Sequence, residues 1–395
     1  MIGKLIIRVM NRMIVFTAFV ILCSSCHMSS TGTMIFNFNN GKIVNFKPSP
    51  SLPGRFREVI IHASPKHGCF FTVQNIKDEG NKYTFIRKKN FAGQELASCK
   101  ILCGVYPESR LFAIDPGCDR LFMTGCLPID EDKKHHESFD WQEMRGFSSW
   151  CDLPENETNI EIAPRRLPDN FPSNFYMAPS IFHKQHAFLS KDILLCVLHK
   201  GSIFSNILPI LNLTAGSFPV FLAKIDLKTN EYHIIKELKS DDGSVFTIPP
   251  DHKIGIKTNE DGKAAILVDH QLYVYDDINE NLSNEIHIAE LPCDDFPMEI
   301  LDFSWISNED ICIWKYYDEH NQGNYIIYNV KTKEKRTGRT NAAIRNFFTP
   351  SICSSSEEVI NLSTKEKIKY PSRLGSRIYE IFWLGDGLLG FTCDF

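Results

Sequence analysis

The feature of this sequence that most restricts its fold is a short unit of two apolar runs joined by a polar turn. Each run is rich in Val, Ile, Phe and Tyr, and the turn carries Asn, Asp, Lys, Thr or Gly, which is typical of an antiparallel hairpin. The unit occurs at residues 35–46, 221–235, 325–335 and 359–369, and with a longer turn at 272–288. From Thr33 onward, almost no stretch keeps helical spacing of apolar residues over three helical turns. The sequence therefore predicts an all-β chain.

The spacing of the hairpins predicts a β-propeller, whose blades are sheets of four short strands. Six blades are expected near 55–103, 109–178, 181–238, 244–290, 300–337 and 342–370. Two strands are left over at each end of the chain, at 35–38, 42–46, 378–384 and 388–393. If these four strands form one composite blade, they pair each other's edges and close the ring. We therefore expect seven blades, although six or eight also fit the spacing.

Two of the hairpin turns share a Thr at the same position. Residues 226–230 read Asp-Leu-Lys-Thr-Asn and residues 329–333 read Asn-Val-Lys-Thr-Lys. Here the chain resembles the WD40-like and TolB-like bacterial propellers, whose hairpins turn at Asp-x-x-Thr-Gly. The resemblance implies a propeller domain over residues 34–395 and no particular activity. A quinone-binding propeller would need Gly and Trp in this repeat, and both are missing, so we expect no cofactor.

The N-terminus has the layout of a secretory signal peptide. A basic stretch over residues 4–12 precedes an uncharged apolar run at 13–22. As a helix this run would be about 15 Å long, half of what a bilayer core requires, so a permanent membrane span is not expected.

The sequence at residues 23–26, Cys-Ser-Ser-Cys, resembles the lipobox of bacterial lipoproteins. The resemblance implies a signal peptide over 1–25, cleavage between Ser25 and Cys26, lipid on Cys26 and a short tether over 26–33. The absence of Asp at His27 implies sorting to the outer membrane. Stable membrane attachment would follow, because more than one acyl chain is added. An ordinary cleaved secretory peptide and an uncleaved anchor remain as alternatives.

Thirteen cysteines raise the question of disulfides. Eleven remain once Cys23 and Cys26 are set aside, and an odd number leaves at least one free thiol. Most lie within apolar runs, where Cys behaves as a small buried hydrophobe. Cys99 and Cys103 would be about 13 Å apart on one strand, too far to bridge. Cys118 and Cys126 are the better candidates for a pair.

Two motifs that could bind ligands are interpreted as structural. Residues 385–390 match G-x-G-x-x-G, but the chain has no room for the following helix and strand of a dinucleotide site, so we expect a tight hairpin turn. The histidines do not have the paired spacing of a zinc site, so no metal is expected and they are interpreted as solvated loop residues. The histidines in question are His135, His136, His183 and His186.

The charge balance and the lack of catalytic motifs restrict the classes of function that the sequence supports. Lys and Arg number 43 and Asp and Glu 48, which argues against nucleic acid because phosphate binding needs a basic footprint. The sequence has no G-x-S-x-G elbow, and its adjacent acids at 241–242, 276–277 and 294–295 are predicted turn residues. No residue is assigned to catalysis. The aromatic side chains are expected to fill the interfaces between blades.

We therefore expect a lipid-anchored cell-envelope protein that binds a protein or carbohydrate partner on one face of the propeller. The alternative is an envelope enzyme, a glycan hydrolase or lyase, with its site at the mouth of the central channel. Converging carboxylates or histidines there would favour the enzyme, and an apolar rim would favour binding. Residues 127–192 are expected to form a blade interrupted by a long loop, a common place for a binding site.

Overall fold

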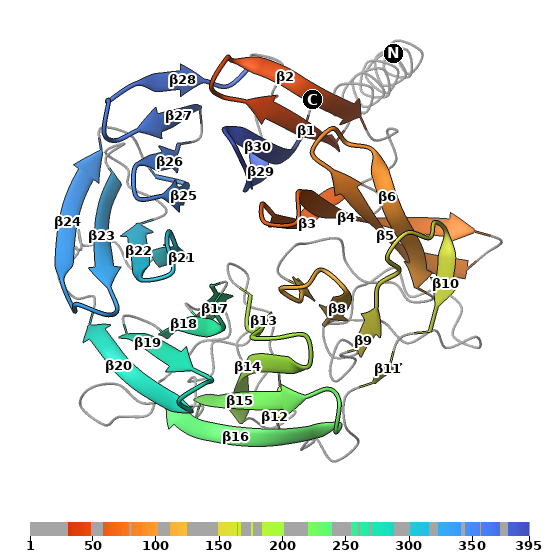
Figure 1. The fold of residues 1–395 in the computed structure, drawn as a ribbon, viewed down its shortest axis with the longest axis horizontal. Helices are drawn as coiled ribbons and strands as arrows, with labels where there is room; N and C mark the ends of the chain where they lie inside the picture. The colour runs from red at the N-terminus through yellow and green to blue at the C-terminus, as the bar shows by residue number, and fades with distance from the viewer. Residues whose placement is uncertain are drawn as a thin grey trace, which may run out of the picture.

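The chain folds into seven separate β-sheets arranged around an axis, as the view along that axis shows (Figure 1). The computed structural model describes residues 31–48, 58–78, 81–101, 111–124, 149–163, 165–166, 175–176, 184–200, 220–238, 254–259, 261–268, 271–287, 301–315, 323–340, 344–355, 357–371 and 378–394. The seven-bladed propeller predicted from the hairpins is confirmed.

The blades are numbered in chain order, and the strands of each are given from the axis outward. Blade 1 comprises β3 (Val59–Ser64), β4 (Cys69–Asp78), β5 (Asn81–Asn90) and β6 (Glu95–Ile101). Blade 2 comprises β7 (Phe112–Ile114), β8 (Arg120–Met123), β9 (Ser149–Asp152) and β11 (Arg165–Arg166). Blade 3 comprises β13 (His186–Phe188), β14 (Ile193–Lys200), β15 (Val220–Asp226) and β16 (Glu231–Leu238). Blade 4 comprises β17 (Ile254–Thr258), β18 (Lys263–Val268), β19 (Gln271–Asp276) and β20 (Asn281–His287).

The last three blades complete the ring. Blade 5 comprises β21 (Leu301–Trp305), β22 (Asp310–Lys315), β23 (Gly323–Asn329) and β24 (Lys335–Thr340). Blade 6 comprises β25 (Asn346–Thr349), β26 (Ile352–Ser354), β27 (Glu358–Asn361) and β28 (Lys367–Lys369). Blade 7 comprises β29 (Ile378–Gly385), β30 (Leu388–Asp394), β1 (Thr31–Asn37) and β2 (Lys42–Pro48).

Blade 7 joins the two ends of the described chain. β1 pairs with β30 without interruption, from Thr31 opposite Asp394 to Asn37 opposite Leu388. The backbone N–H of Phe38 also donates to the carbonyl of Gly387 at 3.0 Å, which links the two turns of the blade. The composite blade predicted from the leftover strands is confirmed.

Two short strands depart from the predicted blade boundaries. β10 (Ile160–Ile162) was expected in blade 2, but it pairs in parallel with β6 at the outer edge of blade 1. β12 (Phe175–Tyr176), also expected in blade 2, pairs with β14 of blade 3. In both cases the segment covers a strand edge of a neighbouring blade, and an uncovered edge is costly.

Five outer turns share one hydrogen-bonded conformation. In each, the side chain of an Asn or Asp accepts a hydrogen bond from the backbone N–H two residues later; these residues are Asn37, Asp226, Asp276, Asn329 and Asn361. The fifth residue of each turn has a positive φ, as at Lys365 (61°) and Lys333 (63°). This is the position that Gly holds in Asp-x-x-Thr-Gly. Gly41 holds this position in the turn after Asn37, and the other four turns keep the same conformation even though Lys, Asn or Glu replaces the more favourable Gly.

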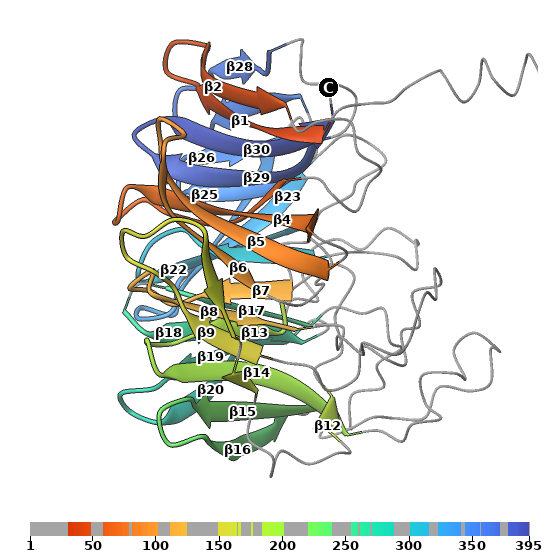
Figure 2. The ribbon, with the colours of Figure 1, turned by 90° about the vertical axis from the view of Figure 1, so that its right-hand side faces the viewer.

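The two faces of the ring differ in their connections. Short turns join the first strand to the second in every blade, and the third to the fourth in every blade except blade 2. These turns lie together on one face, which we call the turn face; the opposite face is called the far face (Figure 2). β1 begins at Thr31, and because the β1–β2 turn lies on the turn face, Thr31 lies toward the far face.

Buried apolar clusters lie between neighbouring blades, one at each of the seven interfaces of the described chain. Each blade contributes to two of them because successive side chains of a strand point to opposite sides. The largest cluster joins blades 1 and 2 and includes Phe71 and Phe112. The smallest joins blades 7 and 1, and its buried members are Ile35, Ile60, Phe70 and Leu384. The expectation that aromatic side chains fill blade interfaces is confirmed for these positions.

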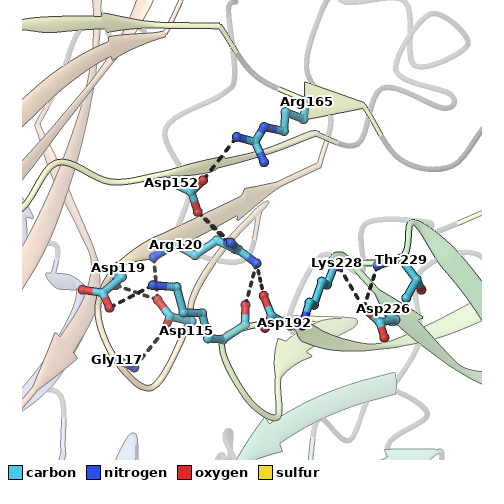
Figure 3. Close-up of polar contacts among 11 residues, drawn as sticks. Asp115, Gly117, Asp119, Arg120, Asp152, Arg165, Asp192, Asp226, Lys228 and Thr229 are labelled. Carbon is cyan, nitrogen blue, oxygen red and sulfur yellow. Dashed lines mark hydrogen bonds and ion pairs between the residues drawn. The ribbon is translucent and has the colours of Figure 1, made fainter.

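Blades 2 and 3 are also joined by a buried cation (Figure 3). Arg120 donates to Asp152 at 2.8 Å and to Asp192, in the β13–β14 turn of blade 3, at 2.6 Å. Its guanidinium lies 4.5 Å from the ring centroid of Trp150, and that of Arg165 lies 4.6 Å from the same ring. Burial alone would lower the pKa of Arg120, but the two carboxylates outweigh burial and raise it. Arg120 therefore remains charged and clamps the two blades.

Candidate functional site at the ring axis

Five ionisable side chains come from the innermost segments of five blades, and we call them the axial cluster. They are His62 on β3, Lys184 just before β13, Lys257 on β17, Asp302 on β21 and Glu380 on β29. Each stands in a mostly apolar innermost strand or directly beside one. The ring architecture brings them together although they are widely spaced in sequence.

Lys257 is fixed by blade 5. Its Nζ donates to Asp302 Oδ1 at 2.9 Å and to the carbonyl of Phe303, and it lies 5.1 Å from the ring centroid of Phe303. The indole N–H of Trp305 donates to the carbonyl of Lys257 at 2.8 Å. The Lys257–Asp302 pair therefore fastens blade 4 to blade 5 as well as placing charge at the axis.

Lys184 has a different environment. Its Nζ donates to the carbonyl of Ile61 on β3 at 3.2 Å, and its own carbonyl accepts from the N–H of Ile256 at 2.8 Å. Burial lowers the pKa of Lys184 to about 8; Glu380 opposes this shift and Lys257 adds to it. A substantial fraction of Lys184 is therefore neutral slightly above neutral pH, as is required of an amine that acts as a base.

His62 connects the axial cluster to the core between blades 1 and 2. Burial lowers its pKa, Lys184 and His67 add to the decrease, and a hydrogen bond with Cys118 opposes it. The His62 ring also packs against Phe71, with 6.1 Å between ring centroids. His62 is therefore neutral at pH 7 and close to a thiol.

None of these five residues was identified from the sequence. The available signal was a single charged residue inside a mostly apolar run, as in Ile254–Thr258 (Ile-Gly-Ile-Lys-Thr) and Leu301–Trp305 (Leu-Asp-Phe-Ser-Trp). That signal recurs in several blades, but one run alone does not indicate that its charged residue meets another at the axis.

The residues predicted for membrane attachment lie outside the described part of the chain. These are Ser25, Cys26 and the rest of the signal segment 1–25. His135, His136 and His183, which were weighed as metal ligands, also lie outside the described residues.

His186 is described, and its interpretation as a solvated loop residue is wrong. It lies on β13, is 2% exposed, and packs edge-on against Phe122 with 4.9 Å between ring centroids. Burial lowers its pKa to about 3, and Lys184 adds to the decrease, so the ring is neutral. The innermost strand of blade 3 alternates too briefly to be recognised as buried from its sequence.

The predicted pair of Cys118 and Cys126 is not formed, because Cys118 is a free buried thiol. Its partner is Cys69 of blade 1, with which it shares a side-chain hydrogen bond. The prediction that cysteines in apolar runs are buried is confirmed for Cys69, Cys196 and Cys312.

The interpretation of residues 385–390 as a hairpin turn, and of the adjacent acids as turn residues, is supported where the chain is described. Residues 385–387 form the tight turn between β29 and β30, with positive φ at Gly385, Asp386 and Gly387. Asp276 and Asp277 lie at the start of the β19–β20 turn, where Asp276 caps backbone N–H groups. The acid pairs at 241–242 and 294–295 lie outside the described residues.

Within the described residues, no three His, Cys, Asp or Glu side chains converge in a way that could hold a metal ion. The same part of the chain holds no helix with the length and apolar character needed to cross a membrane.

The chain resembles solved structures of other proteins, but its sequence does not place it in a family. No family model matches the chain, and no curated protein sequence matches it. Among solved structures it is similar to an oligogalacturonate lyase from Vibrio parahaemolyticus, with 10% identity, 86% of this chain and 84% of that chain covered, and a TM-score of 0.49. It is also similar to a periplasmic gluconolactonase from Pseudomonas aeruginosa, with 11% identity, coverage of 87% and 96%, and a TM-score of 0.43. TolB from Acinetobacter baumannii shows 10% identity, coverage of 80% and 64%, and a TM-score of 0.36.

Proposed function

We propose that this chain is a lipid-anchored binding protein of the bacterial cell envelope, attached to a membrane through Cys26. The resemblance of its N-terminus to bacterial lipoproteins that are sorted to the outer membrane supports that membrane as the site of attachment. The observation that carries the proposal is the short distance in sequence between the lipobox-like segment and the propeller. β1 begins at Thr31, five residues after Cys26. A lipid on Cys26 would therefore hold the ring itself against the membrane surface.

This short tether also gives the ring an orientation. Five residues span at most about 18 Å when fully extended. Thr31 lies toward the far face, so the far face would lie near the membrane and the turn face would point into solution. We propose that a protein or carbohydrate partner in solution binds from the turn face.

The electrostatics of the axial cluster favour binding over glycan hydrolysis. Hydrolysis uses two carboxyl groups, one as acid and the other as base or nucleophile. Here Asp302 is held by Lys257 at 2.9 Å, and Glu380 interacts with Lys184. Each carboxylate of the cluster therefore faces a lysine.

The orientation and the partner are tested together by photo-crosslinking. A photoreactive amino acid is placed at Lys228, exposed on the turn face, or at Arg339, exposed on β24 near the far face. In cells, the probe at 339 is expected to crosslink to lipid, and the probe at 228 to a soluble protein or glycan identified by mass spectrometry. The matched control is Cys26→Ser, in which lipid crosslinks from position 339 should disappear. Lipid crosslinks from position 228 instead would contradict the proposed orientation.

A second candidate function is a lyase, and Lys184 is the observation that favours it. Elimination from an acidic sugar needs one base near the scissile bond, and a lysine whose pKa is about 8 is suited to that task. The test is to incubate the protein with acidic oligosaccharides and follow the ultraviolet absorbance of unsaturated products. Activity should rise with pH through about 8 and be lost in Lys184→Met. Lys257→Met is the comparison, and activity that survives Lys184→Met would rule out this assignment.

A further inference from the structure

Two cysteines from different blades meet at the interface of blades 1 and 2. Cys69 is the first residue of β4, and Cys118 lies in the β7–β8 turn of blade 2. Both are free, both are at most 1% exposed, and their thiols share a hydrogen bond. They are separated by 49 positions in sequence but belong to the same apolar cluster.

The groups around this pair are those that promote thiol chemistry. The Cys118 thiol also shares a hydrogen bond with the His62 ring. Lys88 approaches from β5, where its Nζ donates to the carbonyl of Cys118 at 3.5 Å. The hydrogen bond from Cys118 lowers the pKa of Cys69, Lys88 adds to the decrease, and burial opposes it. The hydrogen bond with Cys69, followed by burial, raises the pKa of Cys118. Cys69 is therefore the thiol better able to exist as a thiolate.

The backbone at Cys118 provides an independent observation. Its φ is 62°, in the left-handed region that a non-glycine side chain enters at a cost. The turn is held by Asp115, whose Oδ1 accepts from the N–H of Asp119 at 2.7 Å and of Arg120 at 2.6 Å. A Gly at position 118 would relieve the strain, but it would remove the thiol that faces Cys69.

We propose that Cys69 and Cys118 form a reversible disulfide that covalently links blade 1 to blade 2. The oxidant is a small-molecule disulfide or an enzyme that carries a reactive disulfide. The capacity to form the bond is a property of the folded chain. Only its occurrence in the cell rests on the proposed envelope location, which is a compartment where disulfides persist.

The chemistry balances as two thiol–disulfide exchanges. The Cys69 thiolate attacks one sulfur of the oxidant's disulfide, forming a mixed disulfide and releasing one thiolate. The Cys118 thiol gives its proton to His62, and its sulfur attacks the sulfur of Cys69, forming the Cys69–Cys118 bond and releasing the second thiolate, to which His62 passes the proton. The protein loses two protons and two electrons, and the oxidant is reduced to two thiols.

The oxidant reaches this buried pair from the turn face. Cys69 directly follows the β3–β4 turn and Cys118 lies in the β7–β8 turn, so opening of either turn exposes sulfur. Asp115→Ala removes the side chain that holds the second turn, and it is expected to increase the oxidation rate several-fold.

The experiment oxidises purified protein in buffers of reduced and oxidised glutathione, followed by alkylation and peptide mapping. The expected product has a single linkage between the peptides that contain Cys69 and Cys118, and its melting temperature is several degrees higher than that of the reduced form. Cys118→Ser should abolish both the linkage and this increase. His62→Gln should slow oxidation at least tenfold at neutral pH and leave the final extent unchanged.

The chain supplies its own control pair. Cys312 of blade 5 and Cys353 of blade 6 also interact across a blade interface, and burial raises the pKa of each. This pair should remain reduced in the buffer that oxidises Cys69 and Cys118. Free thiols at both Cys69 and Cys118 under all buffers would overturn the proposal, and so would a linkage from Cys118 to Cys126. Because the protein is oxidised in vitro, these outcomes do not depend on whether Cys26 carries lipid.

Discussion

Blade 1 presents two chemically different sides to its neighbours, although the same strands build both. Toward blade 7, its side chains include Phe70, which packs in the smallest apolar cluster. Beside it, Glu58 (4% exposed) accepts hydrogen bonds from Lys89 and Thr72 and lies 3.4 Å from Arg87. This interface therefore combines a small apolar core with a buried ionic network.

Toward blade 2, the same strands contribute Phe71, Cys69 and Ile61 to the largest apolar cluster of the described chain. Phe70 and Phe71 are adjacent on β4 and point to opposite sides because strand side chains alternate. Neighbouring residues of one strand therefore serve different purposes. The side chains that point toward blade 7 include paired charges, and those that point toward blade 2 form a large apolar core that contains the reactive thiol.

The largest expected effect comes from removing the central ring of the apolar side. Phe71→Ala should destabilise the fold by about 4 kcal/mol, because it leaves a cavity that the surrounding side chains cannot move far enough to fill. Phe70→Ala removes the same group on the ionic side and should cost about 3 kcal/mol, since less apolar material surrounds it. Urea unfolding of both variants measures the difference. An equal or reversed order would show that cluster size does not decide the strength of the two interfaces.

The next effect comes from the ionic side. Lys89→Met leaves Glu58 buried without its closest cation and should cost about 3 kcal/mol. Lys331→Met is the matched control, because the side chains of the Lys331–Glu309 pair are 73% and 47% exposed, and the pair should contribute less than about 1 kcal/mol. If Lys89→Met lowers the free energy of unfolding no more than the control variant does, then burial does not increase what an ion pair contributes to stability.

The same variant changes the pH dependence of stability. Burial raises the pKa of Glu58, but Lys89 and Arg87 outweigh it, so the folded pKa lies below the usual value of 4.5. The charged network therefore stabilises the native chain above about pH 4.5, and this stabilisation is lost as the pH falls through the lowered pKa. Without Lys89, burial counts for more and the pKa of Glu58 rises. The loss of stability relative to the native chain should therefore become smaller as the pH falls from 7 to 4, because Glu58 becomes protonated in the variant. A deficit that is constant with pH would argue against an ionised Glu58.

The smallest effect is stabilising and lies away from blade 1. Lys365 has a φ of 61° and is exposed, so Lys365→Gly should stabilise the fold by about 1 kcal/mol. Ser363→Gly in the same turn does not relieve a positive φ and should destabilise it slightly. Thermal unfolding of the two variants measures the sign of each effect.

Sequence patterns predicted what depends on neighbouring residues and missed what depends on contacts between blades. The alternation within each hairpin is local, so the seven blades and the composite blade 7 could be derived from it. The parallel pairing of β10 with β6 could not, because nothing in Ile160–Ile162 specifies which edge it covers. For the same reason Cys118 was assigned to Cys126, its nearest suitable neighbour in sequence, whereas the fold brings it to Cys69.

The axial cluster shows the same limit for function. Lys184 and Glu380 are almost two hundred positions apart, and their interaction exists only once the ring closes. A lysine next to a strand also has an ordinary pKa unless its surroundings exclude water, and sequence carries no direct measure of that exclusion.

The most direct test of the proposed envelope function is the intact mass of the native chain purified from membranes. We expect a chain that begins at Cys26 and carries the added mass of a diacylglycerol and an acyl chain, and a Cys26→Ser variant that lacks this mass and is found in the soluble fraction. A native chain that keeps residues 1–25, or one that begins near Cys26 without added mass, would contradict the lipid anchor and the orientation of the ring derived from it.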